Sequence, residues 1–318
     1  MRRRAYISLV AFVATLALAH LVTRRLLPAL YRAKAVRELV SPQRREALDP
    51  TGRRGEVAVI GTSLSGGLAP ALATRFGGTF INRARPGSLM ADEWAQSVYA
   101  RTAGARLLLF ELDPFTWHPE HAGELLRYPL YAGALAGAAG PAVARRIFGQ
   151  LGVEGVLSRL AEQFAPARLR LSGVASAWRA PLLSAFAGAP IDQEPPPTFD
   201  GDVCEVWLRL RLDRGDLDVL DDYLGWIERE RLDVIFFLPQ LRRSGIAADC
   251  GQDALRRLEQ WLSAIRVHLE ARHHHVADFT RAVDESLLTD FGHIAHEADY
   301  ARLADAWSAE LGPWSARW

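Results

Sequence analysis

Three polar residues near opposite ends of the chain have the chemical types needed for nucleophilic catalysis. Ser63 stands in the stretch VAVIGTSLSGG, and Asp290 and His293 stand in LLTDFGHIAHEADY. A serine hydroxyl is a weak nucleophile, so it needs a base within hydrogen-bond reach and a third group that orients the base. Only two residues separate Asp290 from His293, so one short loop can present both side chains. The sequence therefore predicts Ser63 as nucleophile, His293 as general base and Asp290 as its orienting carboxylate.

The residues around Ser63 do not fit two other common motifs. The nucleophile elbow of α/β-hydrolases has a glycine two residues before and two residues after the serine. Ser63 has Gly61 before it but Ser65 after it. Neither a phosphate-binding loop with its Lys-Ser/Thr pair nor a GxGxxG fingerprint occurs in the sequence. The structural alternative for Ser63 is a small residue that caps a helix after a strand.

Apolar runs that alternate with helical segments predict the scaffold that would bring these residues together. The predicted strands cover 56–61, 79–84, 106–114, 232–240 and 274–280, and the predicted helices cover 64–76, 88–104, 216–230, 249–272 and 297–311. Strands and helices in this alternation indicate an α/β fold with a parallel sheet and helices on both faces. Ligands of such sheets bind beyond the carboxyl ends of the strands. Ser63, the RPGS turn, Asp113 and the LPQ turn all fall on that edge.

Composition divides the chain into four regions. Residues 1–25 are predicted to form a membrane anchor or signal segment, and residues 26–55 a basic juxtamembrane connector. Residues 56–114 and 213–318 form the α/β domain. Residues 115–212 form a mostly helical insertion, rich in Ala, Gly, Leu and Arg, that ends in the proline-rich DQEPPPTFDGD.

The first region begins with three arginines, followed by an uncharged run from Ala5 to Val22. This length is at the lower limit for crossing a hydrocarbon core of about 30 Å. We favour an uncleaved transmembrane helix, because the apolar run continues past the cleavage-like Ala17-Leu18-Ala19. A removed leader and a hydrophobic first helix of a soluble protein are the two alternatives. Arginines on both sides of the run leave its orientation open.

Net charge, cysteines and histidines indicate which kinds of binding partner and metal site the sequence does not favour. The net charge of +1, with no basic stretch interleaved with aromatic residues, argues against binding to nucleic acid. Cys204 and Cys250 do not form a metal-ligand pattern, and a disulfide and two free thiols both stay open. The histidines at 273–275 would alternate faces in a strand, so they cannot all bind one ion.

In their order and placement, these motifs resemble those of the SGNH (GDSL-like) hydrolase superfamily. The resemblance is strongest to its membrane-anchored envelope branch, which includes the teichoic acid D-alanyl-transfer protein and the alginate O-acetylation proteins. It covers about residues 56–114 and 232–311. Gly61-Thr62-Ser63 is similar to the first motif, Gly-Asp-Ser, and Gly87 to the glycine of the second motif. The segment 290–293 is similar to the last motif, Asp-x-x-His, whereas Asp113 in FELDPF stands where the third motif carries Asn.

The resemblance implies a three-layer, flavodoxin-like (SGNH) domain with a five-stranded parallel sheet. It implies a membrane-anchored serine esterase or O-acyltransferase that forms an acyl-enzyme on Ser63. The acceptor would be a cell-envelope glycan or lipid, and an integral-membrane acyl-transfer partner would supply the acyl donor. The enzyme would be a single-pass protein of the bacterial cytoplasmic membrane with a periplasmic catalytic domain. No metal or organic cofactor is implied.

The resemblance also assigns roles around the nucleophile. The backbone N–H groups of Ser63 and Gly87 would bind the oxyanion. Arg83 and Arg85 would hold an anionic or sugar substrate, and solvated surface arginines are the alternative. Asp113 would contact the acceptor or point elsewhere, because a charged carboxylate repels an oxyanion. The departures at Thr62 and Asp113 favour the alternative function, a non-catalytic SGNH-like scaffold that binds a glycan or a partner protein.

Overall fold

The computed structural model of this protein describes residues 55–117 and 203–315, together with 132–135, 138–140, 143, 144 and 146. The chain separates into two compact units, Arg53–Gln150 with Pro196–Trp318, and Met1–Gly52 with Leu151–Pro195. All described residues belong to the first unit. The predicted anchor at 1–25, almost all of the connector at 26–55 and most of the predicted insertion at 115–212 lie outside the described residues.

A five-stranded parallel sheet forms the centre of this unit. Its strands are β1 (Val57–Ile60), β2 (Phe80–Asn82), β3 (Leu107–Glu111), β4 (Asp233–Leu238) and β5 (Val276–Asp278). They lie in the order β2-β1-β3-β4-β5, and every neighbouring pair is parallel. This confirms the predicted α/β class, the number of strands and the flavodoxin-like order.

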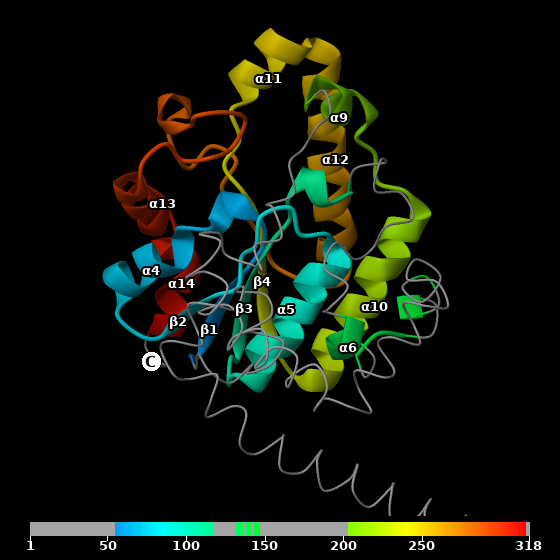
Figure 1. Ribbon diagram of the computed structural model, residues 1–318, viewed down its shortest axis with the longest axis vertical. Coiled ribbons are helices and arrows are strands. Elements are labelled where there is room, and N and C mark those ends of the chain that lie inside the picture. Colours follow the sequence, from blue (N-terminus) through cyan, green and yellow to red (C-terminus); the bar gives the residue numbers. More distant parts are fainter. Residues whose placement is uncertain are drawn as a thin grey trace, which may run out of the picture. The chain divides into compact units, whose positions relative to one another are not determined.

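Helices cover both faces of the sheet. They are α4 (Leu68–Phe76), α5 (Met90–Thr102), α6 (Ala132–Leu135), α9 (Val203–Arg209), α10 (Arg214–Glu230), α11 (Arg243–Cys250), α12 (Gln252–Glu270), α13 (Tyr300–Ala306) and α14 (Ser308–Ser315). Figure 1 shows α4, α13 and α14 on one side of the sheet and α5, α10 and α12 on the other. This arrangement follows from the strand order, because a crossover between parallel strands places its helix on a face of the sheet.

Both faces of the central strands are buried, which explains their continuous apolar sequence. All four residues of β1 and all five of β3 are buried. On one face, Val57 and Val59 pack in a cluster with Leu72 and Trp307. On the other face, the Tyr223 ring of α10 lies 4.8 Å from the ring of Phe110 and 5.7 Å from that of Trp94. Burial of each such side chain contributes about 1.5–3 kcal/mol to stability.

Three differences from the sequence prediction concern elements that are interrupted or that begin late. The helix predicted at 249–272 is two helices, α11 and α12, which separate at Gly251 with a φ of +89°. Such a left-handed backbone interrupts a helix, and glycine adopts it without steric cost. The last predicted helix is divided into a 3₁₀ turn, Glu297–Asp299, followed by α13 and α14. The fifth strand begins only at Val276, because His273 takes a φ of +61° in the preceding turn.

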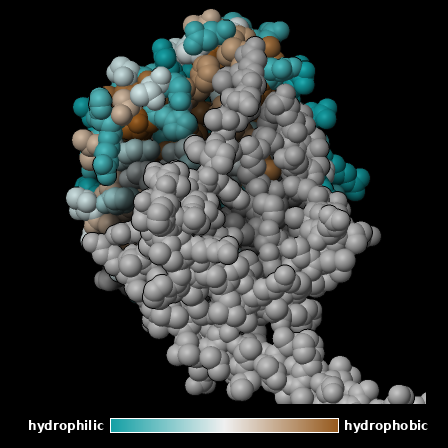
Figure 2. All heavy atoms as spheres, viewed as in Figure 1, coloured by the Kyte–Doolittle hydropathy of each residue, from teal (hydrophilic) through white to brown (hydrophobic). Residues whose placement is uncertain are grey.

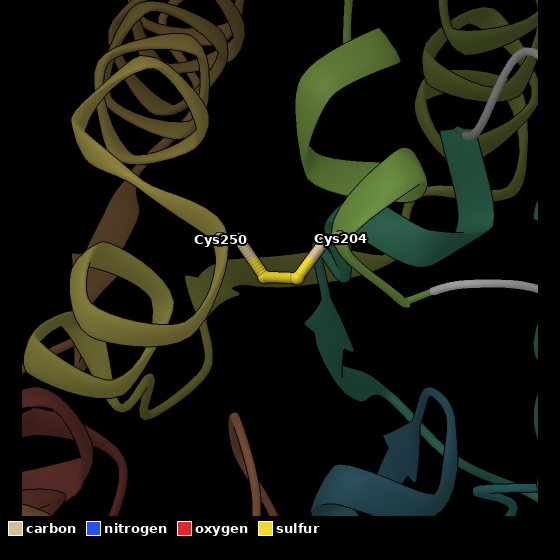
Figure 3. Close-up of a disulfide and its surroundings, with 2 residues drawn as sticks. All are labelled: Cys204 and Cys250. Atoms are coloured by element: carbon tan, nitrogen blue, oxygen red, sulfur yellow. A yellow bond between two sulfur atoms is a disulfide. The ribbon is translucent and has the colours of Figure 1, made fainter.

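Cys204 of α9 and Cys250 of α11 form a disulfide, which decides between the two alternatives that the sequence left open (Figure 3). The bond joins residues 46 positions apart. It fixes α9 where this helix packs on α11 and α12. Structural disulfides persist mainly in oxidising compartments.

The described surface is polar over much of its outline. Figure 2 shows hydrophilic residues along the outer rim of this part of the chain. Within it, the large apolar side chains that stand exposed are Leu208 and Val267. Across the described ranges, no helix has both the length and the apolar character needed to cross a bilayer. The predicted span at 5–22 lies outside those ranges.

Removing the disulfide should destabilise the domain without changing its fold. We expect a C204S/C250S variant to lose roughly 2–4 kcal/mol of unfolding free energy, because the cross-link restricts the unfolded chain. Guanidinium-induced unfolding followed by circular dichroism measures this loss. Reductant should shift the wild-type midpoint to that of the variant and leave the variant unchanged. Equal midpoints for the oxidised wild type and the variant would contradict the prediction.

Candidate active site

Ser63 lies in a tight turn at the carboxyl end of β1. Gly61 follows the strand, and a Cβ atom at this position would lie 2.6 Å from Cβ of Glu111. Only glycine therefore allows the chain to pass so close to β3. Thr62 is extended and caps the 3₁₀ turn Ser63–Ser65, accepting a hydrogen bond from Leu64 N–H at 3.4 Å. The turn exposes Ser63 in part, while Thr62 and Leu64 on either side of it are buried.

Asp290 and His293 lie on one closed loop after β5. An antiparallel bridge between Leu288 and Ile294 joins the ends of the loop. Inside it, the Thr289 N–H donates to the His293 carbonyl at 2.8 Å. Oδ1 of Asp290 accepts the backbone N–H groups of Gly292 and His293, each at 2.9 Å. These bonds fix the orientation of the Asp290 carboxylate relative to the His293 imidazole.

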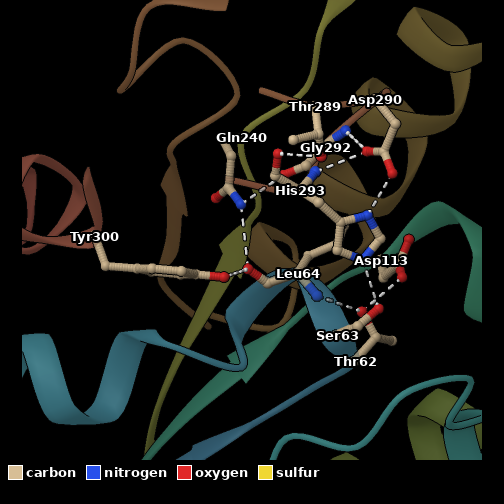
Figure 4. A network of polar contacts seen from close by, with 10 residues as sticks. All are labelled: Thr62, Ser63, Leu64, Asp113, Gln240, Thr289, Asp290, Gly292, His293 and Tyr300. Carbon is tan, nitrogen blue, oxygen red and sulfur yellow. Dashed lines mark hydrogen bonds and ion pairs between the residues drawn. The ribbon is translucent and has the colours of Figure 1, made fainter. Parts of the chain in front are cut away.

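The structure brings Ser63, His293 and Asp290 together in a hydrogen-bonded series (Figure 4). His293 Nε2 lies 2.7 Å from Ser63 Oγ, and His293 Nδ1 lies 2.7 Å from Asp290 Oδ2. A carboxylate only accepts hydrogen bonds, so Nδ1 carries a proton and donates it to Asp290. The neutral imidazole then presents Nε2 as acceptor for the Ser63 hydroxyl. This is the geometry in which a histidine can act as general base toward a serine.

The charges of the loop favour a histidine that readily accepts a proton. Partial burial raises the pKa of Asp290, but hydrogen bonds from the His293 side chain and from two backbone N–H groups outweigh burial and lower this pKa to about 2. The hydrogen bond to Asp290 raises the pKa of His293, against the opposing effect of desolvation. The negative charges of Asp290, Asp113 and Glu111 raise it further. The imidazolium form is therefore stabilised.

Aromatic packing supports the loop from its outer side. The ring of Phe291, between Asp290 and His293, lies 5.9 Å from the buried ring of Trp207 on α9. Trp207 in turn lies 4.7 Å from Phe115, which follows β3. The helix fixed by the disulfide is thus in direct contact with the loop of the candidate base. Asp290 and His293 themselves stay accessible, with side chains 50% and 43% exposed, so a substrate can reach them.

Asp113 lies beneath the nucleophile turn and is bonded within the protein. It is 3% exposed, and its Oδ1 accepts the Phe115 N–H at 2.9 Å. Its Oδ2 lies 2.8 Å from Oγ1 of Thr62, and the same hydroxyl lies 2.5 Å from Oε1 of Glu111. A hydroxyl has a single proton, so it donates to only one of these carboxyl groups. The second contact requires a proton on the other carboxyl group.

The titration of these buried acids agrees with a shared proton. Burial and the neighbouring charge of Asp113 raise the pKa of Glu111 from 4.5 to about 7, although hydrogen bonds from Thr62 oppose the rise. Burial also raises the pKa of Asp113. Glu93 of α5 is buried in the same region, and desolvation with the charges of Glu111 and Asp113 raises its pKa well above the ordinary value. Because the charge of Asp113 raises the pKa of Glu111, we expect these two groups to titrate as a pair.

The other predicted binding residues differ in how deeply they are buried. Gly87 is exposed in the turn after β2, with a left-handed φ of +65° that favours glycine. Arg83 is only 1% exposed, so it is not a solvated surface arginine, whereas Arg85 is half-buried. The Arg85 N–H donates to the Gly61 carbonyl at 2.8 Å, which attaches the RPGS segment to the nucleophile turn. Contact of these residues with a substrate stays a prediction.

Two residues of the site, Glu111 and Gln240, and one structural neighbour of the nucleophile turn, Tyr300, had no predicted role. Glu111 is the charged last residue of an otherwise apolar strand, and this break in the pattern was its only signal. Gln240 belongs to the LPQ turn, which the sequence placed at the correct edge without assigning it a task. Tyr300 donates from its hydroxyl to the Leu64 carbonyl at 3.2 Å. Nothing in its local sequence distinguishes it from a core aromatic residue.

Comparisons with known proteins assign no family. No protein-family model matches the sequence, and a search of curated proteins finds no significant match. In the described residues, no cluster of three or more His, Cys, Asp or Glu side chains could hold a metal ion. The functional argument therefore depends on the geometry of the site.

Substitution of Asp290 should lower the pKa of His293. Asp290→Asn removes the bond that contributes most to the raised pKa, so His293 should lose its proton at a lower pH than in the wild type. An NMR titration of the imidazole resonances measures the change. Glu310→Gln is the matched control, because it removes the negative charge beside a different histidine, His275, and leaves the contacts of His293 unchanged. An unchanged His293 pKa in D290N would contradict the described contact.

Glu111 should make the domain less stable as the pH rises from about 4.5 to about 7. A carboxyl group whose pKa is higher in the folded than in the unfolded state binds more protons when folded, so stability falls with pH in this window. Glu111→Gln does not titrate, so its unfolding free energy relative to that of the wild type should rise by about 1–3 kcal/mol between pH 4.5 and about pH 7. Urea unfolding at several pH values tests this. Parallel pH profiles for wild type and E111Q would contradict it.

Proposed function

We propose that this protein is a serine esterase or O-acyltransferase of the SGNH type, which acts through an acyl-enzyme on Ser63. The observation that carries the proposal is the series Ser63 Oγ, His293 Nε2 and Asp290 Oδ2, with 2.7 Å at each step. A structural serine at a helix cap needs no histidine, and a solvated histidine needs no carboxylate. The three together fit nucleophilic catalysis.

The chemistry follows from the protonation states. Ser63 Oγ attacks the acyl carbonyl carbon while His293 Nε2 takes the hydroxyl proton. The imidazolium then gives this proton to the leaving oxygen, and the carbonyl re-forms as the acyl-enzyme. A water molecule or an acceptor hydroxyl next attacks the acyl carbonyl, His293 takes its proton, and this proton returns to Ser63. Asp290 keeps its negative charge throughout and orients the imidazole.

The oxyanion requires donors on the side away from the carboxylates. We assign this role to the backbone N–H groups of Ser63 and Gly87, as the motif order suggests. Loss of one such donor typically costs about 10²–10³ in rate. Both oxygens of Asp113 are engaged with Thr62 and Phe115, so Asp113 supports the turn from beneath in this proposal.

The acceptor and the location are inferred from the envelope branch that the motifs resemble. We propose a single-pass protein of the bacterial cytoplasmic membrane, with its catalytic domain in the periplasm and a cell-envelope glycan or lipid as acceptor. An integral-membrane partner would deliver the acyl donor. The Cys204–Cys250 disulfide is consistent with an oxidising compartment such as the periplasm. The uncharged run at 5–22 supports an anchor.

A non-catalytic scaffold is the competing function, and the departures at Thr62 and Asp113 were the argument for it. In the structure these two side chains contact each other at 2.8 Å. The two departures are thus complementary, as expected of a site that keeps its geometry with different residues. This pairing weakens the case for a scaffold.

Labelling with a fluorophosphonate probe tests the activated serine. We expect Ser63 Oγ of the full-length, detergent-solubilised protein to bond to phosphorus with loss of fluoride, read as an adduct by intact mass. Ser63→Ala should abolish the adduct, and His293→Ala should slow its formation by at least about 10², because the general base is lost. His296→Ala, which replaces a neighbouring exposed histidine, is the control and should label at the wild-type rate. No adduct on a folded wild type would favour the scaffold.

A further inference from the structure

A buried glutamine connects the nucleophile turn to the loop of the candidate base. Gln240 follows β4 and is 1% exposed. Its side-chain Nε2 donates to the Leu64 carbonyl at 3.2 Å and to the Gly292 carbonyl at 2.9 Å. Leu64 is the residue after Ser63, and Gly292 is the residue before His293. Figure 4 shows the amide between the two backbone segments.

The orientation of this amide is fixed by its partners. Both partners are carbonyl oxygens, so only the NH₂ end of the side chain can face them, and its two protons serve one carbonyl each. One planar group therefore spans two segments that are 176 and 52 residues away from it in the chain. Rotation of the amide would place its oxygen against a carbonyl and lose both bonds.

The segment that carries Gln240 is itself held on both sides. The Leu241 N–H donates to the Thr280 carbonyl after β5 at 3.3 Å, and the Arg242 N–H donates to the Phe291 carbonyl at 2.8 Å. Gln240 thus projects from a backbone that is bonded to the same loop as its side chain.

The two segments that it joins are in close contact. A Cβ atom at Gly292 would lie 3.0 Å from Cδ2 of Leu64 and 3.1 Å from the Gln240 carbonyl oxygen. The base loop therefore lies directly on the residue after the nucleophile. A small shift of one segment changes the separation of Ser63 and His293.

We propose that Gln240 is a positioning residue of the acyl-transfer reaction, whose amide sets the separation between Ser63 and His293. This inference rests on the proposed function. General-base catalysis requires the two atoms within hydrogen-bond reach, and a misplacement of about 1 Å can cost about 10² in rate. Gln240 contacts neither reacting atom directly and acts through the backbone neighbours of both.

Tyr300 provides a matched comparison. Its hydroxyl donates to the same Leu64 carbonyl at 3.2 Å, but its bond does not connect this carbonyl to the base loop. Tyr300→Phe removes one buried hydrogen bond from the nucleophile turn and leaves the Gln240 bridge. Gln240→Met keeps the length of the side chain and removes both donors. A purely structural role predicts that each variant lowers the labelling rate only in proportion to its loss of thermal stability, whereas a positioning role predicts an additional loss of rate in Q240M.

The test is the concentration dependence of fluorophosphonate labelling for the full-length wild type, Q240M and Y300F, with thermal unfolding of each. We expect Q240M to lower the maximal labelling rate by about 10–10², because the base is no longer held at Ser63. The half-saturating probe concentration should change little. Y300F should stay within about threefold of the wild type, although its thermal midpoint also falls.

A second variant separates the loss of positioning from misfolding, should Q240M fail to fold. Gln240→Asn keeps an amide donor but is one methylene shorter, so it cannot span both carbonyls. It should fold and show a similar loss of maximal rate. Equal labelling rates for the Gln240 variants and Y300F, on a wild type that labels, would overturn this inference alone. A folded wild type without any adduct would overturn the proposed function, and the positioning role with it.

Discussion

The hydrogen bond between Ser63 and His293 joins residues 230 positions apart, and the strand order determines how it can form. β1 and β5 are not neighbours, because β3 and β4 lie between them. The loop after β5 must therefore extend across the carboxyl ends of two strands to reach the serine. Each intervening strand contributes a residue beneath this loop, Asp113 after β3 and Gln240 after β4. The side chains of both contact the nucleophile turn. The hydrogen bond between Ser63 and His293 is thus supported by residues that follow β1, β3, β4 and β5.

The buried acidic residues of this arrangement lower the stability of the folded domain when they are charged. Three carboxyl groups, Glu93, Glu111 and Asp113, are at most 3% exposed. Burial makes the charged forms unfavourable, and the groups respond with raised pKa values. Arg83, which follows β2, brings a buried positive charge into the domain interior. Apolar residues at these positions would often be at least as stable, so the buried acids near Ser63 favour a functional role for the candidate site.

Sequence patterns were sufficient for the parts of the fold that depend on local chemistry. Short apolar runs located all five strands, three of them closed by glycine or proline, and the Asp-x-x-His spacing located the candidate base loop, because both are properties of short segments. They failed where the determinant is a distant contact. Gln240 has a role only through Leu64 and Gly292, and Glu111 only through Thr62 and Asp113. The helix break at Gly251 was missed because a long amphipathic pattern continues across it, and the Cys204–Cys250 pairing depends on how α9 packs.

Asp113, which follows β3, restricts where the oxyanion donors of the site can lie. Imidazolium forms as a serine attacks, and negative charge near it lowers the barrier. Asp290 supplies this charge at Nδ1, and Asp113 and Glu111 supply it from beneath the turn. The same charge opposes an oxyanion on that side. A proton shared through Thr62 limits this repulsion, because the pair then carries one negative charge in place of two. The proposed reaction can therefore use the carboxylates for the base only if the oxyanion forms away from them, at the backbone N–H donors that we assign to Ser63 and Gly87.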